Sequence, residues 1–251
     1  MKNIIYEDKD ILVVYKPAGI ATQTARTCQQ DMVSELKNYL AAGAKGKGNR
    51  EPYLGLVHRL DQPVSGLLVF AKSRQAAAGL GSQVTDGQMK KYYYAVIYGK
   101  PKEPAGRLED FLYKDGKNNQ SLVVDERFPN AKKAVLEYKL VKTLMALEED
   151  MCIGKHGSHS KEREVSLVEI RLITGRHHQI RVQLSCRDMP LLGDNRYGSP
   201  GSKELSQKAG CRNVALCAYK LTFYHPVSGE KLEFEKQPEG EIFLPFFTSA
   251  F

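Results

Sequence analysis

The segment Leu56-Val-His-Arg-Leu-Asp61-Gln-Pro-Val-Ser-Gly66-Leu-Leu-Val-Phe-Ala-Lys72 sets a polar turn between two apolar stretches. Leu54–Leu60 and Leu67–Ala71 are short and hydrophobic, which predicts two buried strands. The turn between them holds a histidine, an arginine and Asp61. Because loops held between rigid strands often carry functional groups, this turn is the first candidate for an active site.

Asp61 alone is ambiguous. An aspartate in a proline-containing turn commonly caps that turn, or it pairs with a neighbouring cation such as Arg59. Gly66 marks a position where the backbone turns or approaches another segment more closely than a side chain would allow. Further motifs in the sequence are therefore needed to distinguish a turn residue from a catalytic residue at Asp61.

Strand signals dominate the rest of the chain. Apolar runs and alternation predict strands over Asp10–Tyr15, Tyr92–Tyr98, Ala134–Leu140, Val165–Ile173, Leu216–Phe223 and Lys231–Phe234. Helical spacing predicts helices over Asp31–Ala42, Ser73–Thr85 and Gln179–Cys186. No shift in composition marks a domain boundary. We therefore expect residues 1–251 to form one α+β domain with a central mixed, mainly antiparallel β-sheet flanked by helices and loops.

Composition narrows the classes of function. The chain has 251 residues, of which 42% are hydrophobic and 26% charged, as in soluble globular proteins. Its five cysteines are scattered, its N-terminus has no signal peptide pattern, and its apolar runs are too short to span a bilayer. We expect a cytoplasmic protein. Its 37 basic residues exceed its 29 acidic ones and give a net charge of +8, which suits a polyanionic partner.

The opening segment closely resembles the signature of the RluA-type pseudouridine synthase family. The matching residues are His58, Arg59, Leu60, Asp61, Ser65, Gly66, Phe70, Ala71 and Lys72. The resemblance continues through Tyr6–Gly19, Lys91–Gly99, Thr174–Val182, Leu191–Gly198 and Ala215–Pro226. Val64 stands where threonine is usual, and Gln183 and Cys217 stand where histidine is usual. These departures bear on packing or substrate details.

The resemblance implies an enzyme that isomerises specific uridines in structured RNA, either rRNA or tRNA, in an active-site cleft across the sheet. It implies that Asp61 is the catalytic carboxylate, acting on the ribose or on the base. Tyr93 resembles the family's active-site tyrosine, which stacks on the flipped uracil. Arg181 is the candidate for keeping a buried Asp61 ionised, and Arg176 is the second candidate or a phosphate ligand.

Other residues are candidates for RNA binding. The resemblance implies that Arg59 fills the space vacated by the flipped base, whereas His58 binds phosphate or has a structural role. Lys45, Lys47 and Arg50 lie in a basic loop that either contacts RNA or is only solvated. The same choice applies to the basic part of the insertion over residues 148–164. Because the family-type opening begins at about Tyr6, we expect the small N-terminal RNA-binding domain of many family members to be absent.

Several alternatives remain at this point. Metal binding would use Cys152, His156, His159 or the adjacent His177 and His178, but paired ligand motifs are missing and neighbours on a strand face opposite ways. Isomerisation itself requires no cofactor. A hydrolase centred on Ser65 lacks the GxSxG elbow, and a nuclease would need clustered carboxylates. A catalytically silent RNA-binding protein would not need Asp61, Tyr93 and Arg181. We expect a monomer without an obligate protein partner or membrane contact.

Overall fold

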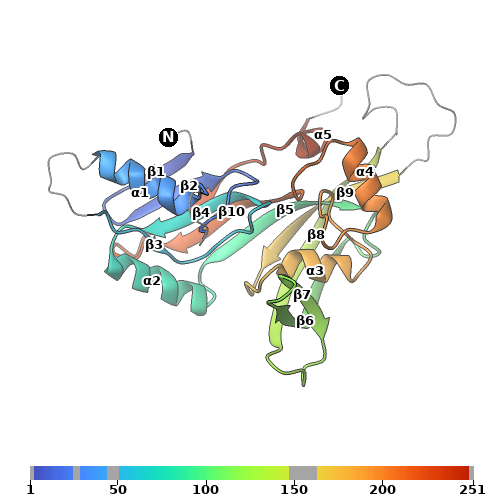
Figure 1. Cartoon of the computed structure of the whole chain (residues 1–251), viewed down its shortest axis with the longest axis horizontal. Helices are drawn as coiled ribbons and strands as arrows, with labels where there is room; N and C mark the ends of the chain where they lie inside the picture. Colours follow the sequence, from blue (N-terminus) through green and yellow to red (C-terminus); the bar gives the residue numbers. More distant parts are fainter. Residues whose placement is uncertain (1–2, 25–28, 44–50, 147–162, 249–251) are drawn as a thin grey trace. The chain divides into compact units, whose positions relative to one another are not determined.

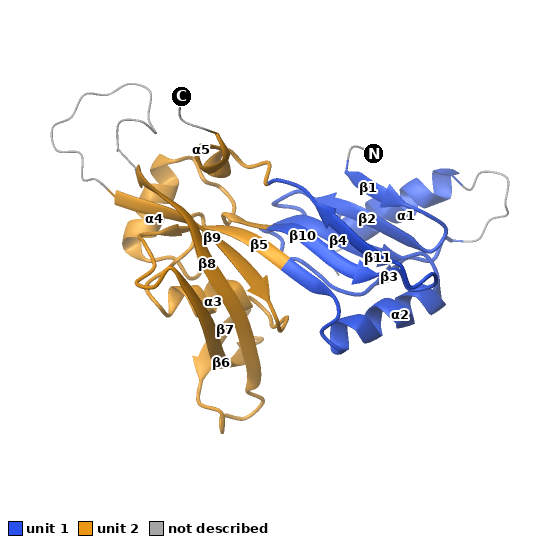
Figure 2. Cartoon of the chain, turned by 180° about the vertical axis from the view of Figure 1, so that it is seen from behind, with its two compact units in different colours: residues 1–91, 218–237 blue, residues 92–217, 238–251 orange. Residues whose placement is uncertain are grey.

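The computed structural model describes residues 3–24, 29–43, 51–146 and 163–248 (Figure 1). Two compact units are distinguished (Figure 2). Unit 1 comprises Met1–Lys91 and Ala218–Gln237, and unit 2 comprises Tyr92–Cys217 and Pro238–Phe251. Strands β5 (Lys90–Tyr98) and β10 (Leu216–Tyr224) contribute residues to both units. Within the described ranges, no helix is long and apolar enough to cross a membrane.

Unit 1 is built on β-strands with two helices. Its strands are β1 (Ile4–Glu7), β2 (Ile11–Lys16), β3 (Gly55–Leu56), β4 (Ser65–Ala71), most of β10, and β11 (Lys231–Glu235). β2 pairs antiparallel with β1 and β4, and β11 pairs antiparallel with β10. β2 is buried along its whole length, and β4 is buried from Gly66 onward. β2 and β4 form the centre of the core because both are nearly uninterrupted runs of apolar, β-prone residues.

The two predicted helices of unit 1 form where their caps indicate. They are α1 (Met32–Gly43) and α2 (Arg74–Thr85). Oδ1 of Asp31 accepts the backbone N–H of Ser34 at 2.7 Å, and Oγ of Ser73 accepts that of Ala76 at 3.1 Å. Each side chain thus satisfies a donor that the first helical turn leaves unpaired. The buried residues of α1 are Met32, Val33 and Leu36, which are three of the five apolar positions of the sequence pattern; Tyr39 is exposed and Leu40 half-buried.

The predicted strand over Leu54–Leu60 is wrong for most of its length. Only Gly55 and Leu56 pair with β4. At Leu60 the backbone N–H and C=O both bond to the hydroxyl of Thr22 instead of to a neighbouring strand. The segment before Asp61 is therefore a loop fixed by a side chain, a long-range contact that local periodicity does not reveal.

Gly66 fulfils the role that its position suggested. Its φ is +129°, and a Cβ placed on it would lie 2.4 Å from both the backbone N and O of Ala218. A contact below 3 Å with backbone atoms cannot be relieved by moving a side chain. The close packing of β4 against β10 in unit 1 therefore requires glycine at this position.

Unit 2 contains the remaining strands. In the order in which they neighbour one another these are β5, β9 (Arg163–Leu172), β8 (Lys132–Ala146), β6 (Ala105–Asp115) and β7 (Gln120–Val124). Its helices are α3 (Gln179–Ser185), α4 (Pro200–Lys208) and α5 (Leu244–Phe247), with the 3-10 turn η1 (Glu241–Phe243). The β6–β8, β6–β7 and β8–β9 pairs are antiparallel, which confirms the mainly antiparallel α+β prediction.

Candidate active site

The backbone before Asp61 is held by Thr22. This threonine is 3% exposed, and its Oγ1 donates to the carbonyl of Leu60 at 2.8 Å. The same oxygen accepts the Leu60 N–H at 3.2 Å. One hydroxyl thus satisfies both polar groups of the buried residue that precedes Asp61. Leaving these groups unpaired would cost about 1–3 kcal/mol each, so the contact fixes this part of the loop.

The backbone after Asp61 is held by the turn that follows β2. The carbonyl of Gln62 accepts the Gly19 N–H at 2.9 Å and the Lys16 ammonium at 3.1 Å. In return, Nε2 of Gln62 donates to the carbonyl of Gly19 at 3.0 Å. Asp61 is therefore flanked on both sides by residues bonded to the segment from Lys16 to Thr22. Two separate attachments within unit 1 thus fix the backbone on either side of Asp61.

Lys16 is a buried cation near Asp61. The residue is 0% exposed, and Nζ donates to the carbonyls of Pro17 and Ile20 at 3.0 and 2.7 Å, in addition to Gln62. Burial lowers the pKa of Lys16 to about 7, while the negative charge of Asp61 acts in the opposite direction. The two side chains are therefore close enough for their charges to interact. The sequence signal for this residue is a lysine at the end of an apolar, β-prone strand.

Replacing Lys16 by methionine tests this burial. Between pH 7 and pH 10.5 the native lysine is neutral and the unfolded lysine binds a proton, so its contribution to stability rises with pH. We expect the wild-type free energy of unfolding, minus that of Lys16→Met, to increase by up to about 4 kcal/mol from pH 7 to pH 10. Urea unfolding at both pH values measures this difference. A difference that does not change with pH would contradict the burial of a titrating lysine.

The two residues before Leu60 have different environments. Nε2 of His58 accepts the Val69 N–H at 3.3 Å, so the ring is attached to the backbone of β4. Removal from water lowers the pKa of His58 to about 3, and the charge of Lys91 acts in the same direction. The ring is therefore neutral at physiological pH, and any contact that it makes with RNA lacks a positive charge. Arg59, in contrast, is exposed.

Tyr93, Arg176 and Arg181 belong to unit 2. Tyr93 on β5 is 5% exposed and lies between the half-buried Tyr92 and Tyr94, as strand alternation predicts. Arg181 is a buried residue of α3, and its guanidinium forms a two-point ion pair with Asp194. Arg176 is exposed, and its Nε donates to the carbonyl of Lys133 at 2.9 Å. Asp194 is a residue of this region that the sequence motifs did not predict to have a role.

Some predicted residues lie outside the described ranges. These are Lys45, Lys47 and Arg50 of the basic loop, most of the insertion, and Cys152, His156 and His159. The expectation that His177 and His178 face opposite ways on a strand is wrong. They lie in a turn before α3, where His178 has a φ of 52° and the two rings stack with their centroids 3.8 Å apart. The left-handed turn replaces strand alternation.

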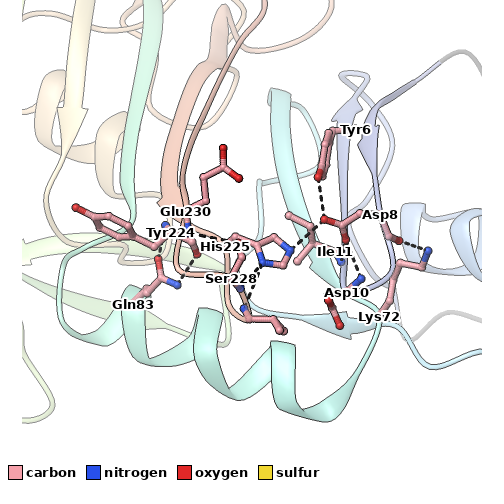
Figure 3. Close-up of polar contacts among 11 residues, drawn as sticks. Tyr6, Asp8, Asp10, Ile11, Lys72, Gln83, Tyr224, His225, Ser228 and Glu230 are labelled. Atoms are coloured by element: carbon pink, nitrogen blue, oxygen red, sulfur yellow. Dashed lines mark hydrogen bonds and ion pairs between the residues drawn. The ribbon is translucent and has the colours of Figure 1, made fainter.

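Among the described residues, Asp8, Asp10 and His225 bring possible metal-ligand atoms within 4.8 Å of one another (Figure 3). Nδ1 of His225 accepts the N–H groups of Val227 and Ser228 at 3.3 and 3.0 Å. Because Nδ1 accepts these bonds, Nε2 is the ring nitrogen that donates, to Oδ2 of Asp8 at 3.0 Å. A metal ion would need the lone pair of Nε2. This arrangement therefore favours a hydrogen bond that joins two turns of unit 1 over a metal site.

Gln183 stands where the family usually has histidine, and its side-chain amide is only partly hydrogen-bonded. Its Nε2 donates to Oδ2 of Asp110 at 2.6 Å and to the carbonyl of Ala134 at 3.3 Å. Oε1 is buried, and no hydrogen-bond partner for it is present in the described part of the chain. Rotating the amide would set Oε1 against the carboxylate, so the orphan acceptor is the better arrangement. Its cost is about 1–3 kcal/mol.

Gln183→His should remove this orphan acceptor and keep a donor for Asp110. The carboxylate should raise the pKa of the new histidine above its ordinary value. The resulting stabilisation is complete below the unfolded pKa of about 6.5 and is lost as pH rises through the folded pKa. The quantity to compare is the free energy of unfolding of Gln183→His minus that of the control Gln183→Leu. We expect this difference to be larger at pH 5.5 than at pH 8 by at least about 1 kcal/mol. Equal differences at both pH values in urea unfolding would refute this account.

Comparison with known proteins agrees with the fold and with the signature segment. The family model described as RNA pseudouridylate synthase matches residues 10–186. The chain therefore belongs to the RNA pseudouridylate synthase family, whose members are isomerases that act on RNA. This confirms the family resemblance seen in the sequence.

Individual relatives cover most of the chain. It is 33% identical to ribosomal large subunit pseudouridine synthase D of Zymomonas mobilis, over 97% of this chain and 71% of that protein. It is 35% identical to an uncharacterized RNA pseudouridine synthase of Bacillus subtilis, over 91% of this chain and 66% of that protein. The solved structure of human RNA pseudouridylate synthase domain containing 4 has a TM-score of 0.70 at 23% identity, over 98% of this chain and 91% of that chain. This last likeness concerns the fold.

Proposed function

We propose that the chain converts specific uridines in structured ribosomal RNA to pseudouridine through the Asp61 carboxylate. The observation that carries this proposal is the double attachment of the Asp61 loop, through Thr22 on one side and Lys16 on the other. Such a loop holds the backbone around Asp61 in place close to the buried Lys16, and a well-positioned carboxylate is what covalent or electrostatic catalysis requires. The names of relatives favour large-subunit RNA as the substrate, and tRNA is the alternative.

The reaction breaks the bond between C1′ of the ribose and N1 of uracil, rotates the base, and joins C1′ to C5. The proton on C5 leaves, and N1 ends with a proton, so atoms and electrons balance without a cofactor. Asp61 attacks the ribose or the base during this exchange. Tyr93 stacks on the uracil, and Arg181 stabilises the carboxylate or the charge that develops near it.

The remaining predicted residues contact the RNA in this proposal. The exposed Arg59 fills the space that the flipped base leaves, which offsets part of the few kcal/mol lost on unstacking. Arg176 contacts phosphate, together with Lys45, Lys47 and Arg50 of the basic loop. His58 acts mainly through the backbone of β4, because its ring is neutral and bonded to Val69. We further propose that residues 1–251 act as one catalytic domain without a metal.

The RNA class is tested by mapping pseudouridine in a strain that lacks the gene. We expect one or more pseudouridines to disappear from large-subunit ribosomal RNA and to return when the wild-type gene is supplied. The Asp61→Asn variant should not restore them. Loss confined to transfer RNA would identify the alternative substrate, and an unchanged map in both RNAs would favour the catalytically silent RNA-binding protein.

A further inference from the structure

The guanidinium of Arg181 is held along one edge by a single carboxylate. Nε donates to Oδ2 of Asp194 at 2.7 Å, and Nη2 donates to Oδ1 at 2.8 Å. The side chains are 6% and 0% exposed, so this pair is removed from water. Two parallel bonds define the plane and the rotation of a guanidinium, which a single bond does not.

Asp194 is itself fixed by the backbone. Its Oδ1 also accepts the N–H groups of Arg196 and Tyr197, at 3.0 and 3.1 Å. Burial by itself would raise the pKa of Asp194, but the bonds and charge of Arg181 and the two backbone amides outweigh it and hold the pKa below the ordinary value. The carboxylate is therefore ionised and has one orientation, which it imposes on the arginine.

The guanidinium carbon of Arg181 also lies over an aromatic ring. Cζ of Arg181 is 5.1 Å from the ring centroid of Tyr197. The hydroxyl of this tyrosine accepts the Ser121 N–H at 2.7 Å and is 2.9 Å from Nδ1 of His178. Tyr197 is thus tied both to β7 and to the turn before α3. The two bonds to Asp194 and this ring contact together leave the guanidinium little freedom to rotate.

We propose that Asp194 is a positioning residue, which orients Arg181 for the chemical step, with Tyr197 supporting the face of the guanidinium. This inference rests on the proposed function, in which Arg181 acts at the reacting groups. A buried ion pair adds little net stability compared with apolar residues of the same volume, so stability alone is a weak reason for this pair. Fixing the plane of the guanidinium also fixes the direction of its third nitrogen, Nη1. Asp194 thereby makes Arg181 a hydrogen-bond donor with a fixed direction.

The test is a double-mutant cycle with Asp194→Asn and Arg181→Lys, measured as pseudouridine formation on one ribosomal RNA transcript. Asparagine cannot form the charged fork, and lysine cannot form two parallel bonds. If Asp194 acts through Arg181, Asp194→Asn should lower kcat by about 10- to 100-fold with little change in KM, since it perturbs a contact made to the transition state. The double variant should then be no slower than Arg181→Lys alone, within about threefold.

Asp110→Asn is the matched control. Asp110 forms an ion pair with Arg187 at 2.8 Å in the same unit and also bonds Gln183 of α3. Its substitution should disturb this part of the fold to a comparable extent while kcat stays within about threefold of the wild-type value. Thermal melting and RNA binding of every variant show which of them are folded. If Asp194→Asn does not fold, Asp194→Glu, which keeps the charge but moves the carboxylate, takes its place with the same expectation.

The outcomes separate the two proposals. A wild-type rate in Asp194→Asn, or losses that multiply in the double variant, would overturn the positioning role and leave the proposed function intact. An equal loss of kcat in Asp110→Asn would do the same, because it would show that any damage to this region slows the reaction. A folded wild-type protein that forms no pseudouridine in any ribosomal RNA would overturn the proposed function and this inference with it.

Discussion

Asp61→Asn is expected to lower the rate of pseudouridine formation by at least about a thousandfold, because it removes the proposed nucleophilic carboxylate while keeping its shape. The loop should remain in place, since it is the backbone of Leu60 and Gln62 that bonds to Thr22 and Lys16. We therefore expect RNA affinity and melting temperature close to the wild-type values. Single-turnover kinetics with excess enzyme measure the rate independently of product release.

Glu51→Gln is a suitable control for this comparison. It also changes a carboxylate to an amide in unit 1, at a side chain that is 74% exposed and pairs with Lys37. An exposed pair of this kind contributes about 0–1 kcal/mol, so activity and stability should both stay near the wild-type values. A rate in Asp61→Asn within tenfold of the wild-type rate would remove Asp61 from the catalytic set.

Gly66→Ala is expected to cause the largest loss of stability, about 3–5 kcal/mol, which approaches the whole stability of many domains. The new Cβ would lie 2.4 Å from backbone atoms of Ala218, and the φ of +129° is one that alanine rarely adopts. Strands β4 and β10 would have to separate, which also moves the end of the loop that carries Asp61. Urea unfolding measures the loss, and insoluble expression would be its extreme form.

Gly81→Ala provides the contrast. Gly81 lies within α2, and a Cβ placed there meets nothing within 4 Å. Because alanine has the higher helix propensity, this variant should gain about 0.5–1 kcal/mol. Similar effects of the two glycine substitutions would show that the close approach of β4 to Ala218 does not control stability.

Local sequence patterns predicted much of this fold because its core strands have strong local signals. β2 and β4 are continuous apolar runs, and the caps Asp31 and Ser73 lie where the side-chain chemistry indicated. β6 was missed because only Leu108 and Leu112 are buried in it, and the charged residues between them leave little apolar periodicity. α4 was missed because Leu205 is its single large apolar residue.

The candidate site was predictable only in part. The signature segment indicated Asp61 as the candidate catalyst, which stays a prediction, and Gly66 as a position of close backbone approach, which is confirmed. The contacts that hold Asp61 come from Lys16 and Thr22, which lie far from it in the sequence and have no pattern that links them to it. The ion pair between Asp194 and Arg181 also joins residues that no local sequence pattern links. Hydrogen bonds of this kind depend on the tertiary fold, which periodicity and propensity do not encode.

The most direct test of the central claim is release of the C5 hydrogen from labelled RNA. Large-subunit ribosomal RNA transcribed with uridine tritiated at C5 is incubated with wild-type protein and with Asp61→Asn, and tritium in water is measured. The account predicts that the wild type releases tritium in proportion to the modified uridines, and that the variant releases less than about a thousandth as fast. Equal release by both proteins would contradict the role of Asp61, and no release by either would contradict the proposed reaction on this RNA.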